Sequence, residues 1–472
     1  MRPGLGRALV FASSAAVLVL EIVAGRLLAP YIGVSLETFT GIIGTILAGI
    51  AVGAAVGGRL ADRHDPDRLI GLALVAGGAL SWLSIPVVSL LGPGLGHAVP
   101  AIVALSFFGF FPPALALTAI SPMVAKLRLR SLGETGEVVG GLSAAGTAGA
   151  LFGTFFTGFV LVAAAPTRPV ILTVGLGLVV WGLVHSLRRG HSAAGPGVAA
   201  GLVFALAAAS VGPCDFESAY ACGRVLVDGD DPSLRFLVLD TVRHGAVDLD
   251  DPAHLEFRYT NIFGDVIDAL PPGPLDALHV GGGAFSMPRY IDATRPGSRH
   301  VVLEIDPLLV EVGRKDLGLV TGDGIEVVTG DARLGTSNLA DDSFDLIVGD
   351  AFGGRSVPWH LTTTEFVAEL DRVLRSGGVY VMNVIDGGDN RFAEAELATL
   401  AEHFDHLAMV VPRNWPRPVP SNQILVASDQ PLPTLVVDPV HGVLVEDLDA
   451  FIDGARPLRD DFAPVEQLAS RS

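Results

Sequence analysis

Long apolar runs fill the first part of the chain. A membrane-crossing helix needs about 20 residues at a rise of about 1.5 Å per residue, and seven runs are about this long: 8–28, 39–60, 68–91, 98–118, 139–163, 168–188 and 194–212. The first run does not read as a cleaved signal peptide, because further apolar runs follow it directly. The pattern predicts a polytopic membrane domain over residues 1–212, in which the Ala- and Gly-rich run 194–212 is only just long enough to span.

The second part of the chain has a different rhythm. Short apolar runs alternate with helical patterns, which is typical of a parallel sheet covered on both faces; these runs lie at 275–280, 300–305, 325–329, 344–350 and 379–385. We therefore expect a nucleoside-binding α/β domain of Rossmann-like, class I methyltransferase-like type over residues 273–430. A small β-region and a connecting helix over 213–272 precede it, and residues 431–472 form a C-terminal tail.

Glycines recur at four-residue intervals in two of the apolar runs. Gly49, Gly53 and Gly57 fall on one stripe of the second run, and Gly149 and Gly153 on one stripe of the fifth. Bare backbone on one side of a membrane helix lets a neighbouring helix approach closely. The spacing predicts tight helix packing along both stripes and identifies no transported substrate.

Charge divides the chain in the same place as hydropathy. Residues 1–212 carry 12 Lys and Arg against 7 Asp and Glu, whereas residues 213–472 carry 19 against 43. An acidic domain of this kind repels nucleic acid, whose binding requires cations, and it favours cationic ligands. The chain has only 2 cysteines and no Cys/His spacing of a zinc site, so we expect no metal site.

Positive charge in alternate loops predicts the orientation in the membrane. The Lys and Arg residues gather at the N-terminus and in every second loop, which predicts a cytoplasmic N-terminus. With seven spans the acidic domain lies outside, where Cys214 and Cys222 could form a disulfide. If the seventh run does not cross, the domain is cytoplasmic and the thiols stay reduced. The sequence leaves both arrangements open in a multi-pass protein of the cell membrane.

Chemically informative residues follow the predicted strands. The first strand ends in Gly281, Gly282 and Gly283, the second in Glu304, the third in Asp331 and Ala332, and the fourth in Asp350. Ligands of parallel sheets bind at the carboxyl ends of the strands, where a glycine turn admits a ligand and an acid can accept hydrogen bonds from ribose hydroxyls. This order indicates a site for an S-adenosylmethionine-type nucleoside, and the missing third glycine of the dinucleotide fingerprint disfavours NAD.

Residues 214–428 resemble the spermidine synthase (polyamine aminopropyltransferase) family. The likeness is carried by ESAYACGRV (217–225), LVLDTVRH (237–244), HVGGGAF (279–285), VVLEIDP (301–307), TGDARL (329–334), FDLIVGDAFGG (344–354) and LRSGGVYVMNV (374–384). The whole chain looks like the membrane-fused branch of that family, in which a polytopic bundle precedes the synthase domain.

The resemblance implies roles for individual residues. Glu304 would hold the ribose, Asp331 and Ala332 would hold the adenine, and Asp350 would be the catalytic base, while the bare backbone of the glycine turn lets the donor approach. The substrate would also lie against three further positions: Tyr220, Ala284 and Pro358. The chain departs from the family's motifs at Ala221, Thr260, Ala284 and Gly353, where the family has Gln, His, Asp and Asp. These departures concern the aminopropyl and amine end of the site.

Three functions follow from this interpretation. The first is a membrane-anchored aminopropyltransferase that moves an aminopropyl group from decarboxylated S-adenosylmethionine, a co-substrate rather than a bound cofactor, to a small cationic diamine. The second is a methyltransferase that uses intact S-adenosylmethionine. The third is an amine transporter or sensor with a degenerate synthase domain. Membrane lipid is the expected partner of the bundle, and the sequence leaves a homo-oligomer open.

Overall fold

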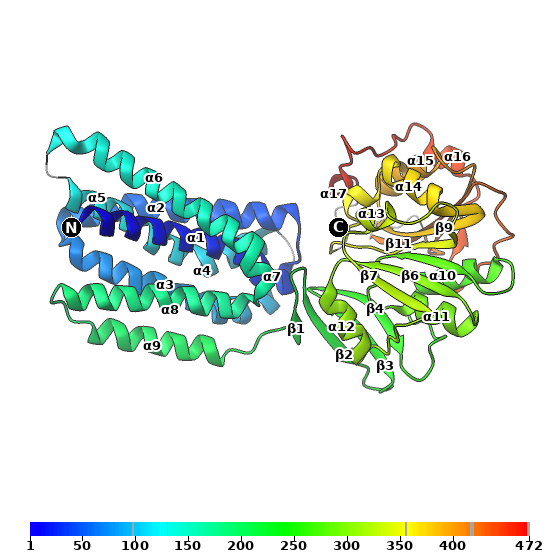
Figure 1. The fold of residues 1–472 in the computed structure, drawn as a ribbon, viewed down its shortest axis with the longest axis horizontal. Coiled ribbons are helices and arrows are strands. Elements are labelled where there is room, and N and C mark those ends of the chain that lie inside the picture. The colour runs from blue at the N-terminus through cyan, green and yellow to red at the C-terminus, as the bar shows by residue number, and fades with distance from the viewer. Residues whose placement is uncertain (97–98, 130, 355, 416–419, 470–472) are drawn as a thin grey trace. The chain divides into compact units, whose positions relative to one another are not determined.

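The structure of the chain is a computed structural model that describes residues 1–96, 99–129, 131–354, 356–415 and 420–469. It divides into two compact units, Met1–Gly223 and Arg224–Ser472, each of which is described by itself. The first unit consists almost entirely of helices and the second is an α/β domain (Figure 1). This agrees with the change in the sequence from long apolar runs to short apolar runs that alternate with helical patterns.

The helices of the first unit follow the predicted apolar runs. They are α1 (Pro3–Ile32), α2 (Leu36–Arg63), α3 (Pro66–Leu95), α4 (Val99–Thr118), α5 (Ile120–Arg128), α6 (Thr135–Phe156), α7 (Val162–Ala164), α8 (Thr167–Arg188) and α9 (Ala194–Ala209). Among the described residues, six segments are long and apolar enough to cross a membrane; α4 with α5 forms one of them, and α6 with α7 another. The seventh predicted run forms α9, a helix of 16 residues, which is about 24 Å long at 1.5 Å per residue.

The glycine stripes lie where two helices meet. A Cβ at Gly53 would clash with the backbone of Leu115 and the hydroxyl of Thr118, both on α4. A Cβ at Gly149 would clash with the backbone of Phe11 on α1. The prediction that these stripes allow close helix packing is therefore confirmed.

The segment that follows α9 is held at one end of this bundle. Arg26, near the end of α1, forms an ion pair of 2.9 Å with Glu217, whose carboxylate also accepts a hydrogen bond of 3.0 Å from the backbone N–H of Thr167 at the start of α8. Arg168 donates to the backbone carbonyls of Ala207 and Ser210 at the end of α9. The chain therefore leaves the bundle at the end where α1 finishes and α8 begins.

A disulfide closes the same segment. Cys214 and Cys222 are bonded. The strand β1 (Phe216–Glu217) lies between the two cysteines in sequence and pairs antiparallel with the first two residues of β2 (Cys222–Val227). Of the two arrangements that the sequence left open, the bonded cysteines agree with an oxidising compartment.

The second unit begins with a small antiparallel sheet. It contains β2, β3 (Leu234–Leu239) and β4 (Val242–Asp248), and α10 (Arg258–Ala269) follows. The sequence predicted this β-region and its connecting helix, with boundaries shifted by a few residues because turns and helix ends are set by local hydrogen bonds.

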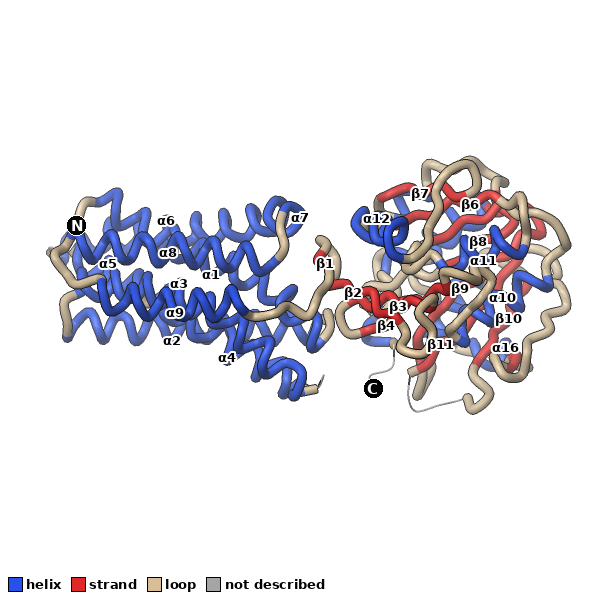
Figure 2. The backbone as a smooth tube through the Cα atoms, turned by 90° about the horizontal axis from the view of Figure 1, so that it is seen from below, coloured by secondary structure: helices blue, strands red, loops and turns tan. Residues whose placement is uncertain are grey.

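An eight-stranded sheet forms the centre of the second unit (Figure 2). Its strands have the order β12-β10-β11-β9-β8-β5-β6-β7, and the neighbours from β9 to β7 are all parallel. The bounds are β5 (Asp276–Val280), β6 (Arg299–Glu304), β7 (Ile325–Thr329), β8 (Phe344–Gly349), β9 (Leu374–Asp386), β10 (His406–Val411), β11 (Ser421–Ser428) and β12 (Val443–Leu444). The order confirms a class I methyltransferase-like fold, in which the direction of winding reverses between β5 and β8.

Helices cover both faces of this sheet. On one face, α10 and α11 (Ser286–Thr294) pack their apolar side chains against Ala277 of β5. On the other face, α14 (Thr364–Val373) and α15 (Arg391–Leu400) pack against Leu278 and Val280 of the same strand. Of the remaining helices, α12 (Pro307–Asp316) and α13 (Ala332–Thr336) follow β6 and β7, whereas α16 (Leu448–Ile452) and α17 (Val465–Leu468) lie in the C-terminal segment. Burial on both faces explains why these strands are nearly continuous apolar runs.

The C-terminal segment packs onto the α/β domain. Leu458 and Val465 are buried in the core on the side of α14 and α15. Asp460 forms a bidentate ion pair of 2.6 Å with Arg333 on α13. Residues 431–469, predicted as a tail, thus contribute to the stability of the domain that precedes them.

Candidate active site

A cavity of about 470 Å³ opens at the carboxyl ends of β5 and β8. Its walls include the predicted residues Gly281, Gly282, Gly283, Ala284 and Asp350. This is the position where the strand order reverses, which is the usual ligand site of an open α/β sheet. The volume lies in the range of pockets for small molecules.

The glycine turn and Asp350 are in direct contact. The backbone N–H of Asp350 donates a hydrogen bond of 3.0 Å to the carbonyl of Val280. At Gly281 the backbone has φ +97°, and a Cβ there would lie 2.7 Å from the carbonyl oxygen of Asp350. Only glycine adopts this conformation without strain and leaves room for the neighbouring strand end.

Two side chains hold the carboxylate of Asp350. Tyr259, on α10, donates its hydroxyl to Oδ2 at 3.0 Å. Asn383, on β9, donates its amide to Oδ1 at 2.9 Å, and its own Oδ1 accepts from the amide of Asn422 on β11 at 3.0 Å. The acid is therefore fixed in orientation by residues from three elements that surround the cavity. An acid at a strand end can also serve to cap the helix that follows. No helix begins at Asp350, so capping does not explain the presence of an acid at this position.

The environment of Asp350 raises its affinity for a proton. Burial raises the pKa of Asp350 from its ordinary value to about 6, and the hydrogen bonds from Asn383 and Tyr259 oppose this rise because they stabilise the charged form. A carboxylate with a pKa close to neutral can accept a proton from a substrate and release it again. The geometry thus fits a general base.

Glu304 lies behind the glycine loop. It is buried at the end of β6, 5% exposed, and its Oε2 accepts hydrogen bonds from the backbone N–H groups of Gly282 at 2.8 Å and Gly283 at 3.3 Å. Its Oε1 accepts from the N–H of Asp306 at 2.9 Å. Burial raises the pKa of Glu304, against these three hydrogen bonds. The carboxylate shapes the loop, and it does not belong to the lining of the cavity.

Asp331 and Ala332 begin a separate short helix. Oδ1 of Asp331 caps α13 by accepting from the N–H groups of Arg333 and Leu334, and its Oδ2 lies 2.9 Å from Nε2 of His360. Neither residue lines the cavity. Their predicted contact with adenine remains a prediction.

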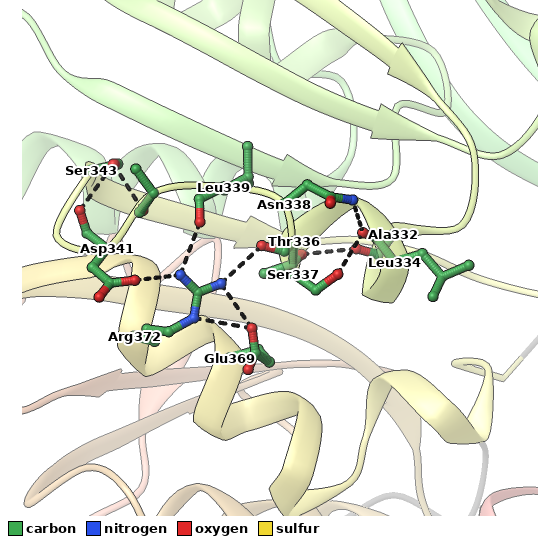
Figure 3. A network of polar contacts seen from close by, with 11 residues as sticks. Ala332, Leu334, Thr336, Ser337, Asn338, Leu339, Asp341, Ser343, Glu369 and Arg372 are labelled. Carbon is green, nitrogen blue, oxygen red and sulfur yellow. Dashed lines mark hydrogen bonds and ion pairs between the residues drawn. The ribbon is translucent and has the colours of Figure 1, made fainter.

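A polar network fixes the far end of α13 (Figure 3). The guanidinium of Arg372, on α14, donates to the backbone carbonyls of Thr336 at 3.1 Å and Leu339 at 2.9 Å, and to the carboxylate of Asp341 at 2.5 Å. Its Nη2 also donates to Glu369 at 2.8 Å. Arg372 therefore joins α14 to the turn between α13 and the start of β8, the end of that strand opposite Asp350.

The three predicted substrate contacts lie in different surroundings. Ala284 is buried, 2% exposed, and lines the cavity. Pro358 precedes the short 3-10 helix Trp359–Leu361 and is outside the lining, whereas Phe352 and Gly354 of the preceding loop are part of it. Tyr220 is in the first unit and half exposed. The roles of these residues in substrate binding stay predictions.

Sequence reasoning missed Tyr259, Asn383 and Asn422. Asn383 interrupts the apolar run VYVMNVI and Asn422 opens the later run SNQILVAS. A polar amide inside a buried strand needs a hydrogen-bonding partner, and this signal could have identified both asparagines. Tyr259 gave no comparable signal, because a tyrosine on an amphipathic helix is ordinary.

Comparison with protein-family models matches residues 278–382 to a methyltransferase domain. This segment runs from β5 to β9 and therefore contains the glycine loop, Glu304, Asp331 and Asp350. The match agrees with the order of the strands.

Curated relatives are similar over part of the chain. The polyamine aminopropyltransferase of Vibrio vulnificus is 34% identical over 114 residues, which are 24% of this chain and 38% of the relative. That of Chromobacterium violaceum is 32% identical over 149 residues, 31% of this chain and 56% of the relative. The chain thus matches less than two thirds of the length of either protein.

A solved structure aligns with about half of the chain. The crystal structure of a probable spermidine synthase from Corynebacterium glutamicum is 27% identical, with a TM-score of 0.49, and the alignment covers 53% of this chain and 97% of that one.

Proposed function

We propose that this chain, whose α/β domain belongs to the spermidine synthase family, transfers an aminopropyl group from decarboxylated S-adenosylmethionine to an amine acceptor. The observation that carries the proposal is the position of Asp350. Its carboxylate faces a glycine-lined cavity at the switch point of the sheet, and Tyr259 and Asn383 hold it in place. The similarity to curated polyamine aminopropyltransferases supports the nature of the group transferred.

The reaction requires a free amine. An alkylamine is protonated at neutral pH, and its nitrogen can attack only after a proton has left. Asp350 accepts that proton, and the nitrogen lone pair then forms a bond to the propyl carbon next to the sulfonium. The C–S bond breaks, and its electron pair converts the sulfonium into the neutral thioether of methylthioadenosine. A positioned carboxylate contributes both proton transfer and alignment of the attacking nitrogen.

The residues of the predicted donor site have different roles. In this proposal the backbone of Gly281, Gly282 and Gly283 lets the nucleoside approach, and Glu304 holds the loop and the ribose. Asp331 and Ala332 border the adenine. Each of these residues stands at the carboxyl end of β5, β6 or β7, and therefore on one edge of the sheet.

We further propose that the first unit anchors the enzyme in the membrane and that the α/β domain follows on the outer side. The bundle supports this, because the segment after α9 is held by Arg26 and Arg168, at the end opposite the Arg-rich loops. The positive-inside rule assigns those loops to the cytoplasm. The Cys214–Cys222 disulfide agrees with an oxidising compartment.

Two experiments test these proposals. Purified full-length protein is incubated with decarboxylated S-adenosylmethionine and a panel of amines, and methylthioadenosine is measured. We expect product with the wild type and a loss of at least about 100-fold for Asp350→Asn, since general base catalysis contributes about this much. If only S-adenosylhomocysteine forms, from intact S-adenosylmethionine, the protein is a methyltransferase. For the topology, a reporter that is active only outside the cytoplasm is fused after Ser472. We expect the reporter to be active; an inactive reporter contradicts the outer location.

A further inference from the structure

The cavity that contains Asp350 has an unusual charge for this domain. The domain is strongly acidic, with 43 Asp and Glu against 19 Lys and Arg in residues 213–472. In the described chain, however, the residues that line the cavity include one acid, Asp350, and two arginines, Arg243 and Arg258. Chance placement in an acidic domain would favour the opposite balance.

The two arginines are available to a ligand. Arg258 is the first residue of α10, is exposed, and has no ion pair or side-chain hydrogen bond with any residue in the described part of the chain. Arg243, on β4, lies with its guanidinium carbon 4.5 Å from the centroid of the Phe236 ring. This contact orients the side chain and does not neutralise its charge.

The other groups around the cavity add no negative charge. His244 and His279 also line it, and burial lowers the pKa of His244 to about 4 and that of His279 well below its ordinary value, so both are neutral at pH 7. The first turns of α10 and α11 border the cavity through Arg258 and Ser286, and neither turn carries an acidic residue. Neither helix therefore carries an acid in its own first turn that would balance the positive end of its dipole.

A simple diamine does not match these charges. It would bring two ammonium groups beside a donor that is itself cationic, and Asp350 alone would have to balance them. The ammonium group that does not react would lie near uncompensated guanidinium groups, which disfavours binding. An acid group on the acceptor would instead pair with arginine, whose planar donors fit carboxylate and phosphate oxygens.

Resting on the proposed function, we infer that the acceptor is an amine that carries an anionic group, a carboxylate or a phosphate, and that Arg258 and Arg243 bind this group while Asp350 receives the proton of the amine. The arginines then determine specificity and take no part in the bond changes. The aminopropyl transfer itself is the reaction described above, with the same bonds formed and broken.

Matched acceptors test this inference. Full-length protein in detergent is supplied with decarboxylated S-adenosylmethionine and with two pairs of amines that differ in the anionic group: ornithine against putrescine, and phosphoethanolamine against ethanolamine. We expect methylthioadenosine formation with a kcat/KM at least about 10-fold higher for the anionic member of one pair, because a hydrogen bond between charged groups has about this effect. The pair that shows the preference identifies whether the anionic group of the acceptor is a carboxylate or a phosphate.

Arginine variants connect the preference to the cavity. Arg258→Gln and Arg243→Gln should each reduce the preference by about 10-fold, mainly through the KM of the anionic amine. Arg314→Gln is the matched control, because Arg314 is exposed on α12 and lies outside the lining.

The outcomes separate the inference from the function on which it rests. If putrescine and ethanolamine are used as well as their anionic counterparts, or if the preference survives both arginine variants, the inference is wrong and the aminopropyltransferase function stands. If no amine yields methylthioadenosine, the proposed function fails and the inference fails with it. If intact S-adenosylmethionine is consumed in an Arg258-dependent manner, the arginines bind the carboxylate of the donor, which overturns the inference.

Discussion

The hydroxyl of Tyr259 donates a hydrogen bond of 3.0 Å to Oδ2 of Asp350, across 91 positions of sequence. Burial of the Tyr259 hydroxyl raises the pKa of the phenol well above its ordinary value, as does the neighbouring Asp350. The phenol therefore remains protonated and acts only as a donor to the carboxylate. This contact links the helix that precedes the parallel sheet to the strand end where we place the chemistry.

The pH dependence of the reaction should report on Asp350. Only the carboxylate form is a base, so kcat/KM with a fixed acceptor should rise with pH, with a midpoint near the pKa of about 6. Tyr259→Phe and Asn383→Leu each remove a donor that stabilises the carboxylate, and each should move this midpoint upward by about one pH unit. Initial rates of methylthioadenosine formation between pH 5 and 9 measure it.

Asn338→Ala is the control for the pH experiment, because Asn338 is exposed, its amide donates to the backbone carbonyl of Leu334, and it lies outside the lining of the cavity. If the midpoint is unchanged in both Tyr259→Phe and Asn383→Leu, Asp350 does not determine the fall of kcat/KM at low pH.

Glu304 should be needed for nucleoside binding. Glu304→Gln replaces one acceptor oxygen by an NH₂ group that cannot accept from the N–H groups of Gly282 and Gly283 or of Asp306. We expect the affinity for methylthioadenosine, measured by calorimetry on the full-length protein, to fall at least about 10-fold. Glu326→Gln, at an exposed position on the adjacent strand β7, is the matched control. Equal affinities for the two variants would exclude a role of Glu304 in the donor site.

The glycine stripe of α2 should limit which residues the bundle tolerates. Gly53→Val places side-chain atoms against the backbone of Leu115 on α4, and overpacking of this kind costs about 1–3 kcal/mol. We expect a lower thermal unfolding temperature for the variant in detergent. Gly44→Val on the same helix meets no atom within 4 Å and should resemble the wild type. Equal stabilities would mean that α2 and α4 are farther apart than the structure indicates.

The two cysteines should be resistant to thiol reagents. Because Cys214 and Cys222 form a disulfide, maleimide should add no mass to protein that is purified without reductant and denatured. After reduction it should add two labels. Labelling without reduction would show free thiols, and it would remove one of the supports for the outer location of the α/β domain.

Several features could be predicted from the sequence because they depend on neighbours along the chain. The strand that ends in Gly281–Gly283 and the strand that ends in Asp350 were both found within about one residue, since short apolar runs followed by glycine or acid mark strand ends in a parallel sheet. The same local signal located Glu304. The length of the seventh helix was harder to predict, because an Ala- and Gly-rich run ends gradually.

The sequence by itself determined a helical bundle followed by a parallel sheet, and it placed Gly281 and Asp350 at strand ends, because hydrophobic periodicity is a local property of the chain. Only the tertiary structure decided which distant side chains complete the site. Tyr259 and Asn383 contact Asp350 from separate elements, and Asn422 donates to Asn383 from a third. Arg243 and Arg258 place two arginines in the lining of the cavity of an acidic domain. Such contacts depend on the packing of elements far apart in sequence, which no local pattern encodes.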